Sequence, residues 1–374
     1  MKRWLRAALL VALIATGSAA ATEAPCGYRL VPSKNPYHLA RDRIRELLLA
    51  GRYEDLDAIE LKSRDLSQRI EDGQQLRSVF FAAVGSSYVG ARVCLGHKPD
   101  EMRPALEAMN ARMMEKVEEW RRAQPLSRAA PIAQAMLHAD RAWAARGISY
   151  ASLVPESAWP IFNTNMKEAA QILDGLEPAL KKDPAWLAER VALAAQLDGM
   201  QDIGDVLNEA LAVSRDYVDL YDIGVNFMLP QWGGSDKAVA RFMDSILDST
   251  AAPSQPYVTY ARVAWNIGDL QMFRSGRVRW EPMQRGFEQI VAEHPHPWNV
   301  NNYARFSCIA GDWDTLKTLL PQIDPPMLAA WDEPTYDDCV RAVRPRINRW
   351  VVVAGAVALL MLVSLWAVVR RRSA

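Results

Sequence analysis

The segment EHPHPWN places two histidines, His294 and His296, beside the carboxylate of Glu293. Imidazole and carboxylate groups are common zinc ligands, so this spacing could begin a metal site. A closed site needs a further ligand, and the two prolines predict an extended connector between helices. The chain carries no HExxH pair, glycine-rich phosphate loop or nucleophile motif. We therefore expect no metal and no other cofactor.

Carboxylate pairs are the second chemistry to consider. Two acids in a tryptophan-lined cleft would suit a helical hydrolase, or a binding accessory, that acts on a glycan or peptide polymer of the cell envelope. Acids such as Glu156, Asp174 and Asp219 are scattered along the chain. Nothing in their linear order makes two of them face each other. No catalytic residue is assigned, and a protein without catalysis is the preferred expectation.

Tryptophan is abundant in this chain, with ten of the thirteen in residues 22–340. One interpretation is an aromatic groove that binds peptide or sugar. The other is that the rings wedge neighbouring helices apart. Structural packing is favoured because five of the rings lie at helical spacing, namely Trp120, Trp143, Trp186, Trp265 and Trp313.

Two short stretches are candidates for partner binding. LPQWGGS contains Trp232, and PWNVNNY contains Trp298, Asn299 and Asn302. An aromatic ring and side-chain amides on one edge of a helical array would suit an extended polypeptide. The alternative is that both stretches only terminate helices, with Asn299 or Asn301 capping the helix that follows.

A repeated pattern predicts the architecture. YARVAWNIGDL and YARFSCIAGDW are written 43 residues apart, and AGRYEDL resembles the end of the second copy. In each copy a glycine, Gly268 or Gly311, is expected to close one helix in the left-handed conformation. Asp269 or Asp312 would then cap the next helix. The repeated unit is a helical hairpin, and stacked hairpins form a solenoid-like array.

Most of residues 36–335 have helical periodicity, and no run of alternating residues there predicts a strand. We expect an all-α fold over residues 36–335, after an N-terminal extension at 22–35. Residues 145–162 read as a connector. Further helices are expected at about 163–180, 184–197 and 203–214, and Ser235 is expected to cap another.

The two ends of the chain predict its cellular address. Residues 1–21 have the basic, apolar and small-residue regions of a cleaved secretory signal. Residues 350–369 are uncharged and long enough to cross a membrane as one helix. A juxtamembrane linker at 336–349 would precede this helix, and residues 370–374 would remain in the cytoplasm. Residues 22–340 hold 34 basic against 44 acidic residues, so nucleic acid is not an expected partner.

Four cysteines lie in the exported part, Cys26, Cys94, Cys308 and Cys339. An even count in an oxidising compartment favours disulfides, and sequence proximity favours the pairs Cys26–Cys94 and Cys308–Cys339. Four buried free thiols are the alternative. No CxxC pair supports a metal site.

The motifs LAGRYEDLDAI, AWAARG, LPQWGGS and WNVNNYARFSCIAGDWDTL resemble a bacterial family of exported, tetratricopeptide-like helical proteins, the domain-of-unknown-function 4034 family. The resemblance spans most of residues 38–320. It implies a helical-repeat fold and brings no catalytic residues. Together with the signal and the apolar span, it predicts a single-pass protein of the bacterial inner membrane with its body in the periplasm. The preferred function is a scaffold for a protein or peptide partner, and the envelope-polymer hydrolase is the alternative.

Overall fold

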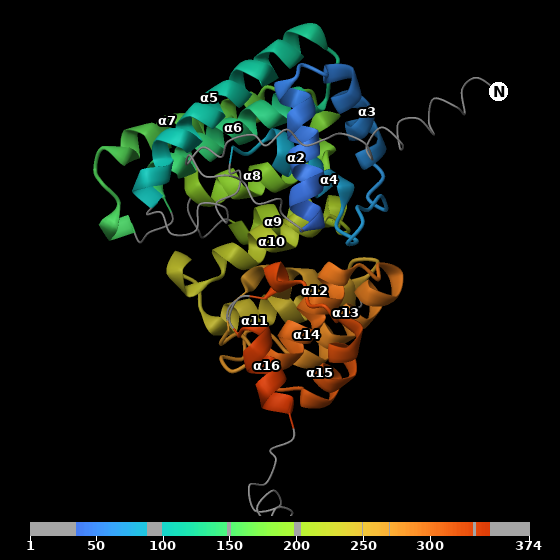
Figure 1. Cartoon of the computed structure of the whole chain (residues 1–374). Helices are drawn as coiled ribbons and strands as arrows, with labels where there is room; N and C mark the ends of the chain where they lie inside the picture. Colours follow the sequence, from blue (N-terminus) through green and yellow to red (C-terminus); the bar gives the residue numbers. More distant parts are fainter. Residues whose placement is uncertain are drawn as a thin grey trace, which may run out of the picture.

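The computed structural model describes residues 35–87, 99–147, 151–197, 203–248, 250–268, 270–331 and 334–344. Within these ranges the chain forms fifteen α-helices, five short 3-10 helices and no strand, which confirms the all-α prediction. Figure 1 shows α2 to α10 in the upper part of the molecule and α11 to α16 in the lower part.

The helices follow one another along the chain, and their connections vary from a few residues to longer segments such as 64–75. The first eight are α2 (Pro36–Leu49), α3 (Tyr53–Ser63), α4 (Leu76–Val84), α5 (Pro99–Ala123), α6 (Ala129–Arg146), α7 (Ala158–Asp174), α8 (Pro184–Leu197) and α9 (Ile203–Ser214). The remaining seven are α10 (Val218–Phe227), α11 (Asp236–Ser245), α12 (Pro256–Ile267), α13 (Trp280–Glu293), α14 (Pro297–Ala310), α15 (Trp313–Leu319) and α16 (Tyr336–Val343). The most extensive packing joins helices adjacent in sequence, such as α6 with α7 and α12 with α13.

The predicted hairpin turns are present, with one difference. Gly311 has a φ of 75°, and the Asp312 carboxylate accepts from the Thr315 amide at the start of α15. Gly268 also closes α12 in the left-handed conformation, but residues 270–279 form turns before α13 begins. Met272 and Val278 of these turns are buried in the core. Apolar packing therefore stabilises this segment although it is not helical. Asp269 lies outside the described residues.

The helices expected at 184–197 and 203–214 are α8 and α9. Ser235 caps α11 by accepting from the Ala238 amide, as expected. Helix α7 begins and ends earlier than expected. Its first turn includes Pro160, which the start of a helix tolerates, and Gly175 and Pro178 follow its last residue.

Two hydrophobic clusters build the core. The first is formed by side chains of α2 to α8, and the second by side chains of α8 and every later helix. Trp120 and Trp186 are buried between helices as expected, and Trp143 and Trp265 are half-buried. Trp313 is 42% exposed, so the wedge prediction is wrong for this ring. Helix α8 belongs to both clusters and therefore joins the two parts of the molecule.

A buried ion cluster ties α3 and α4 to the start of α8. The Arg77 guanidinium donates to Glu60 at 3.3 Å, to the Ser63 hydroxyl at 3.2 Å and to Asp183. All four side chains are buried. Because charges out of water require partners, Arg77 makes the position of α8 depend on α3.

The loop between α3 and α4 clamps the upper part to the lower part. The carbonyl of Asp72 accepts from Asn299 Nδ2 at 3.0 Å and from the Arg262 guanidinium. The Gln75 side chain donates to the Asp216 carbonyl and accepts from the Val218 amide, both at the start of α10. Gly73 has a φ of 83°, and a Cβ there would lie 2.4 Å from the His294 ring, so only glycine fits.

A disulfide joins Cys308 at the end of α14 to Cys339 in α16, with a Cα–Cα distance of 5.8 Å. This pairing was predicted. Cys26, Cys94, the signal at 1–21 and the apolar span at 350–369 all lie outside the described residues. Among the helices that the structure describes, none is both long and apolar enough to cross a membrane.

Candidate functional site

Three of the four residues proposed to bind a partner lie inside the protein. Trp298, Asn299 and Asn302 belong to α14 and are at most 5% exposed. Their side chains therefore do not line an accessible edge. The capping alternative is also wrong, because α14 begins at Pro297 and His296 Nδ1 accepts from the Trp298 amide at 3.0 Å. Proline at the first helical position explains the earlier start.

The buried amides of α14 instead hold neighbouring backbone. Asn301 Oδ1 accepts from the Met327 amide at 3.0 Å and from Trp331 Nε1 at 2.9 Å. Asn299 binds the carbonyl of Asp72, and Asn302 donates to the Trp298 carbonyl. The WNVNNY motif is thus a structural junction where three segments meet.

Trp232, the fourth proposed residue, lies half-buried in a different place. Its ring packs 5.6 Å from the Trp143 ring, edge to face. The Arg146 guanidinium lies 5.2 Å from both of these ring centroids and 5.4 Å from that of Trp159. The ring faces are therefore already occupied by a cation of the same chain, and the cluster links the 3-10 helix Pro230–Trp232 to α6 and α7.

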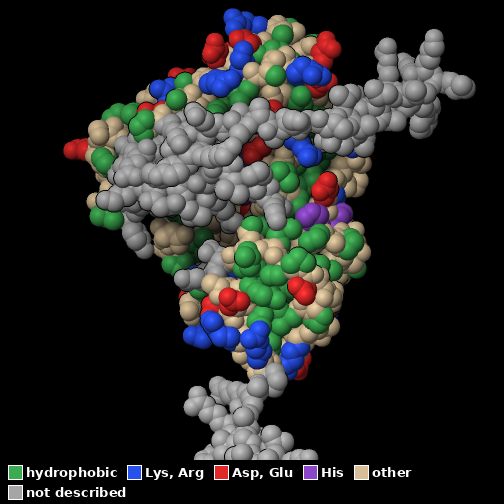
Figure 2. Space-filling view, in the orientation of Figure 1, with side chains coloured by type: hydrophobic (Ala, Val, Ile, Leu, Met, Phe, Trp, Pro, Cys, Tyr) green, Lys and Arg blue, Asp and Glu red, His purple; other side chains and the backbone are tan. Residues whose placement is uncertain are grey.

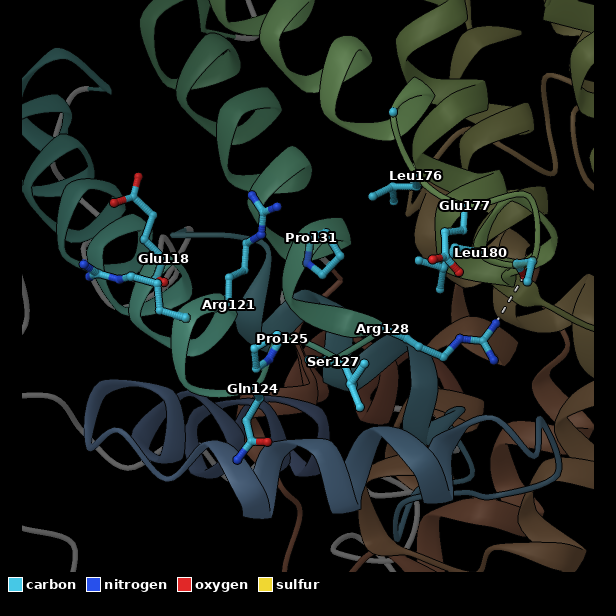
Figure 3. A pocket seen from close by; sticks show the side chains of 14 residues that line it. Glu118, Arg121, Gln124, Pro125, Ser127, Arg128, Pro131, Leu176, Glu177 and Leu180 are labelled. Carbon is cyan, nitrogen blue, oxygen red and sulfur yellow. Dashed lines mark hydrogen bonds between the residues drawn. The ribbon is translucent and has the colours of Figure 1, made fainter.

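An open groove lies between the α5–α6 turn and the α7–α8 connection (Figure 3). Its volume is about 870 Å³. Such a volume is in the range of about 300–1,000 Å³ typical of ligand sites. The lining residues are Glu118, Arg121, Arg122, Gln124, Pro125, Leu126, Ser127, Arg128, Pro131, Gly175, Leu176, Glu177, Ala179 and Leu180.

The groove is lined by three arginines and by two glutamates, Glu118 and Glu177. Arg121 donates to the Gln134 side chain, Arg122 to the Glu118 carbonyl at 3.4 Å and Arg128 to the Ala179 carbonyl at 3.2 Å. Within the described residues, none of the three forms an ion pair with a carboxylate. Figure 3 shows Arg128 extended across the groove toward the α7–α8 connection.

The groove also carries apolar surface. Leu126 is 95% exposed at the tip of the α5–α6 turn. Leu176 and Leu180 are half-buried on the opposite wall, and Pro131 is buried between them and α5. Cations and apolar side chains together suit a ligand that has both acidic and apolar groups.

Burial also raises the pKa values of acids on two other helices, α10 and α8. Burial, and then the charge of Asp219, raises the pKa of Asp222 well above its usual value. Burial, and then the charge of Asp140, raises the pKa of Glu189 to about 7. Asp222 Oδ1 and Glu189 Oε1 are both inaccessible to solvent and make no hydrogen bond. Asp222 Oδ2 accepts from Asn266 at 2.7 Å.

Asp219 and Asp222 are one helical turn apart on α10, so their side chains share one face. The sequence offered Asp219 only as one of many acids. Their spacing of three residues within a predicted helix could have indicated that the two acids lie on the same face. Glu189 is not part of this pair, because the charge that acts on it is that of Asp140 on α6.

The groove had a weak signal that sequence reasoning missed. RRAQPLSR, residues 121–128, combines basic residues at a helix end with an apolar turn. His296 Nε2 lies 3.9 Å from the Glu71 carboxylate, but the described residues contain no cluster of three metal-ligating side chains. His294 packs against Gly73 and His296 caps α14.

Apolar side chains also gather on the visible face of the lower part of the molecule (Figure 2). Leu328, which is 66% exposed, lies in the lower part, on the segment that follows α15.

Comparison with known proteins gives no match to a family model, a curated protein or a solved structure. The assignment of function therefore depends on the residues described above.

Proposed function

We propose that this chain is a membrane-tethered helical-repeat scaffold of the bacterial envelope that binds a polypeptide partner without catalysis. The observation that carries the proposal is the groove between α5, α6 and the α7–α8 connection. Its arginines have no carboxylate partner among the described residues, and its most exposed leucine, Leu126, faces water. Apolar side chains in such a position are characteristic of an interaction surface.

The tether rests on the sequence of the two ends. A signal at 1–21 would export the body, and the apolar span at 350–369 would hold it at the inner membrane with residues 370–374 in the cytoplasm. Only residues 345–349 separate the last described residue from the span. At about 3.5 Å per residue they extend less than ~20 Å, which would keep the array close to the membrane surface.

The tetratricopeptide-like class remains part of this proposal. The hairpin turns at Gly51 and Gly311 and the packing of successive helices support it. Stacked hairpins present helix ends on a common side, and the groove lies where such ends meet.

Site-specific photocrosslinking in cells tests the proposal. A photoreactive side chain at Leu126 is expected to capture a polypeptide partner. The same group at Val213, which is 56% exposed on α9, is expected to capture much less. Equal capture at the two positions, or capture at neither, would count against a partner site in the groove. Fractionation of the same cells tests the tether, because the full chain should pellet with the inner membrane and a chain ending at residue 344 should not.

A second function is favoured by one specific observation. Asp222 and Glu189 have raised pKa values and a carboxylate oxygen without a partner, which is typical of acids used in hydrolysis. Hydrolysis of purified envelope polymer by the exported body, abolished in Asp222→Asn, would establish this function. No release of fragments by the wild-type protein would remove it.

A further inference from the structure

We infer that the groove recognises an acidic polypeptide segment that also carries apolar side chains. The inference rests on the proposed function, because it names the chemistry of the partner at the same site. Its basis is the contrast between the groove and the body around it. Residues 22–340 hold ten more acidic than basic residues, yet the groove is lined by three arginines and two glutamates.

The arginines are arranged so that they can take new partners. Arg121 and Arg122 are exposed on the last turn of α5, and Arg128 is half-buried on the opposite side of the α5–α6 turn. Their present acceptors are an amide side chain and two backbone carbonyls. A guanidinium binds a carboxylate through two parallel hydrogen bonds, which is a stronger contact than either of these.

The apolar lining distinguishes a polypeptide from a phosphate-rich polymer. Leu126, Leu176 and Leu180 offer contacts that a polyphosphate chain cannot use. An acidic peptide with alternate leucine or similar side chains satisfies both kinds of surface. The N-terminal extension of this chain does not fit, because residues 22–34 contain one acidic and two basic residues.

Two matched peptides provide the test. One alternates leucine with glutamate and the other leucine with lysine, and both carry a fluorophore. Binding to the full-length protein in nanodiscs is measured by fluorescence anisotropy at low and physiological salt. The glutamate peptide is expected to bind the wild-type protein at least tenfold more tightly, with an affinity that falls as salt rises.

Charge reversal then locates the site. The variant carrying Arg121→Glu and Arg122→Glu should lose about tenfold in affinity for the glutamate peptide and gain affinity for the lysine peptide. Arg241→Glu, an exposed arginine of α11, should change neither affinity. A variant with Arg121→Gln and Arg122→Gln, which places no acid at a helix C-terminus, should also lose affinity for the glutamate peptide. Circular dichroism confirms that each variant is folded.

The outcomes separate the inference from the proposed function. Equal binding of the two peptides, or affinities unchanged by charge reversal, would overturn the acidic specificity. If crosslinking from Leu126 still captures a partner in that case, the scaffold function stands. If crosslinking from Leu126 captures nothing and neither peptide binds, both the inference and the proposed function are contradicted. If crosslinks form only to a second copy of this chain, the proposal of a separate polypeptide partner is contradicted.

Discussion

Asn299 donates its side-chain amide to the backbone carbonyl of Asp72 over 3.0 Å, although 227 residues separate the two in sequence. Both residues are fully buried. The same carbonyl accepts from Arg262 on α12. The α3–α4 loop is thus held by two helices of the lower part, and we expect the two parts of the array to unfold together.

Asn299→Ala removes the amide and leaves the Asp72 carbonyl with one partner fewer. The free energy of unfolding should fall by about 1–3 kcal/mol, the usual effect of breaking a buried hydrogen bond. Urea unfolding measures it. Asn163→Ala, at an exposed position of α7, is the control and should change stability by less than about 0.5 kcal/mol. Similar losses in the two variants would show that the clamp contributes little.

Arg77→Ala should be more damaging, because it leaves Asp183 buried without its cation and leaves Glu60 with Arg64 alone. Breaking a buried pair from one side destabilises by about 3–5 kcal/mol. Arg52→Ala removes an exposed ion pair with Asp55 and should lower stability by less than about 1 kcal/mol. Thermal unfolding of the two variants side by side provides the comparison, and equal melting temperatures would contradict it.

The Cys308–Cys339 disulfide should hold α16 on the array. Cys339 is the only buried residue of this eight-residue helix, and short helices are not stable alone. A variant with Cys308→Ala and Cys339→Ala should lose about 3–4 kcal/mol by the chain-entropy estimate, since the bridge spans 31 residues. Hydrogen exchange in residues 336–343 should rise sharply. A variant with Cys26→Ala and Cys94→Ala should leave this exchange unchanged, and a protected α16 without the bridge would show that packing alone suffices.

Because the pKa of Glu189 is raised, we expect the free energy of unfolding to fall as pH rises. Burial raises its pKa from 4.5 to about 7 in the folded protein. Between these values the folded protein binds a proton that the unfolded chain has lost, so unfolding becomes easier as pH increases. The contribution is fully present below about pH 4.5 and is lost once pH passes about 7.

The measurement is urea unfolding from pH 4.5 to 7.5. In Glu189→Gln the slope of unfolding free energy against pH should be less negative by up to roughly 1.4 kcal/mol per pH unit in this window. Glu156→Gln, an exposed acid of the α6–α7 connection, should not change the slope. Identical slopes in the wild-type protein and Glu189→Gln would mean that Glu189 is ionised in the fold.

Local patterns in the sequence were sufficient for the elements. Apolar spacing predicted α8 and α9, glycine after an apolar helix predicted the turns at Gly268 and Gly311, and Ser235 and Asp312 were recognised as caps. Each of these signals acts within one or two turns of helix. The competing signals also act locally, since proline at position 297 moved the start of α14 ahead of the asparagines.

Only the tertiary structure decided which side chains are accessible and which meet. It buried Trp298, Asn299 and Asn302, surrounded Arg146 with rings from three elements, and brought Glu189 of α8 within reach of the charge of Asp140 on α6. It also opened the groove beside Leu126. Burial depends on contacts between residues far apart in the chain, and helical periodicity does not determine which helices approach one another. The sequence by itself therefore determined the helices and the chain's expected address, whereas packing determined where a partner could bind.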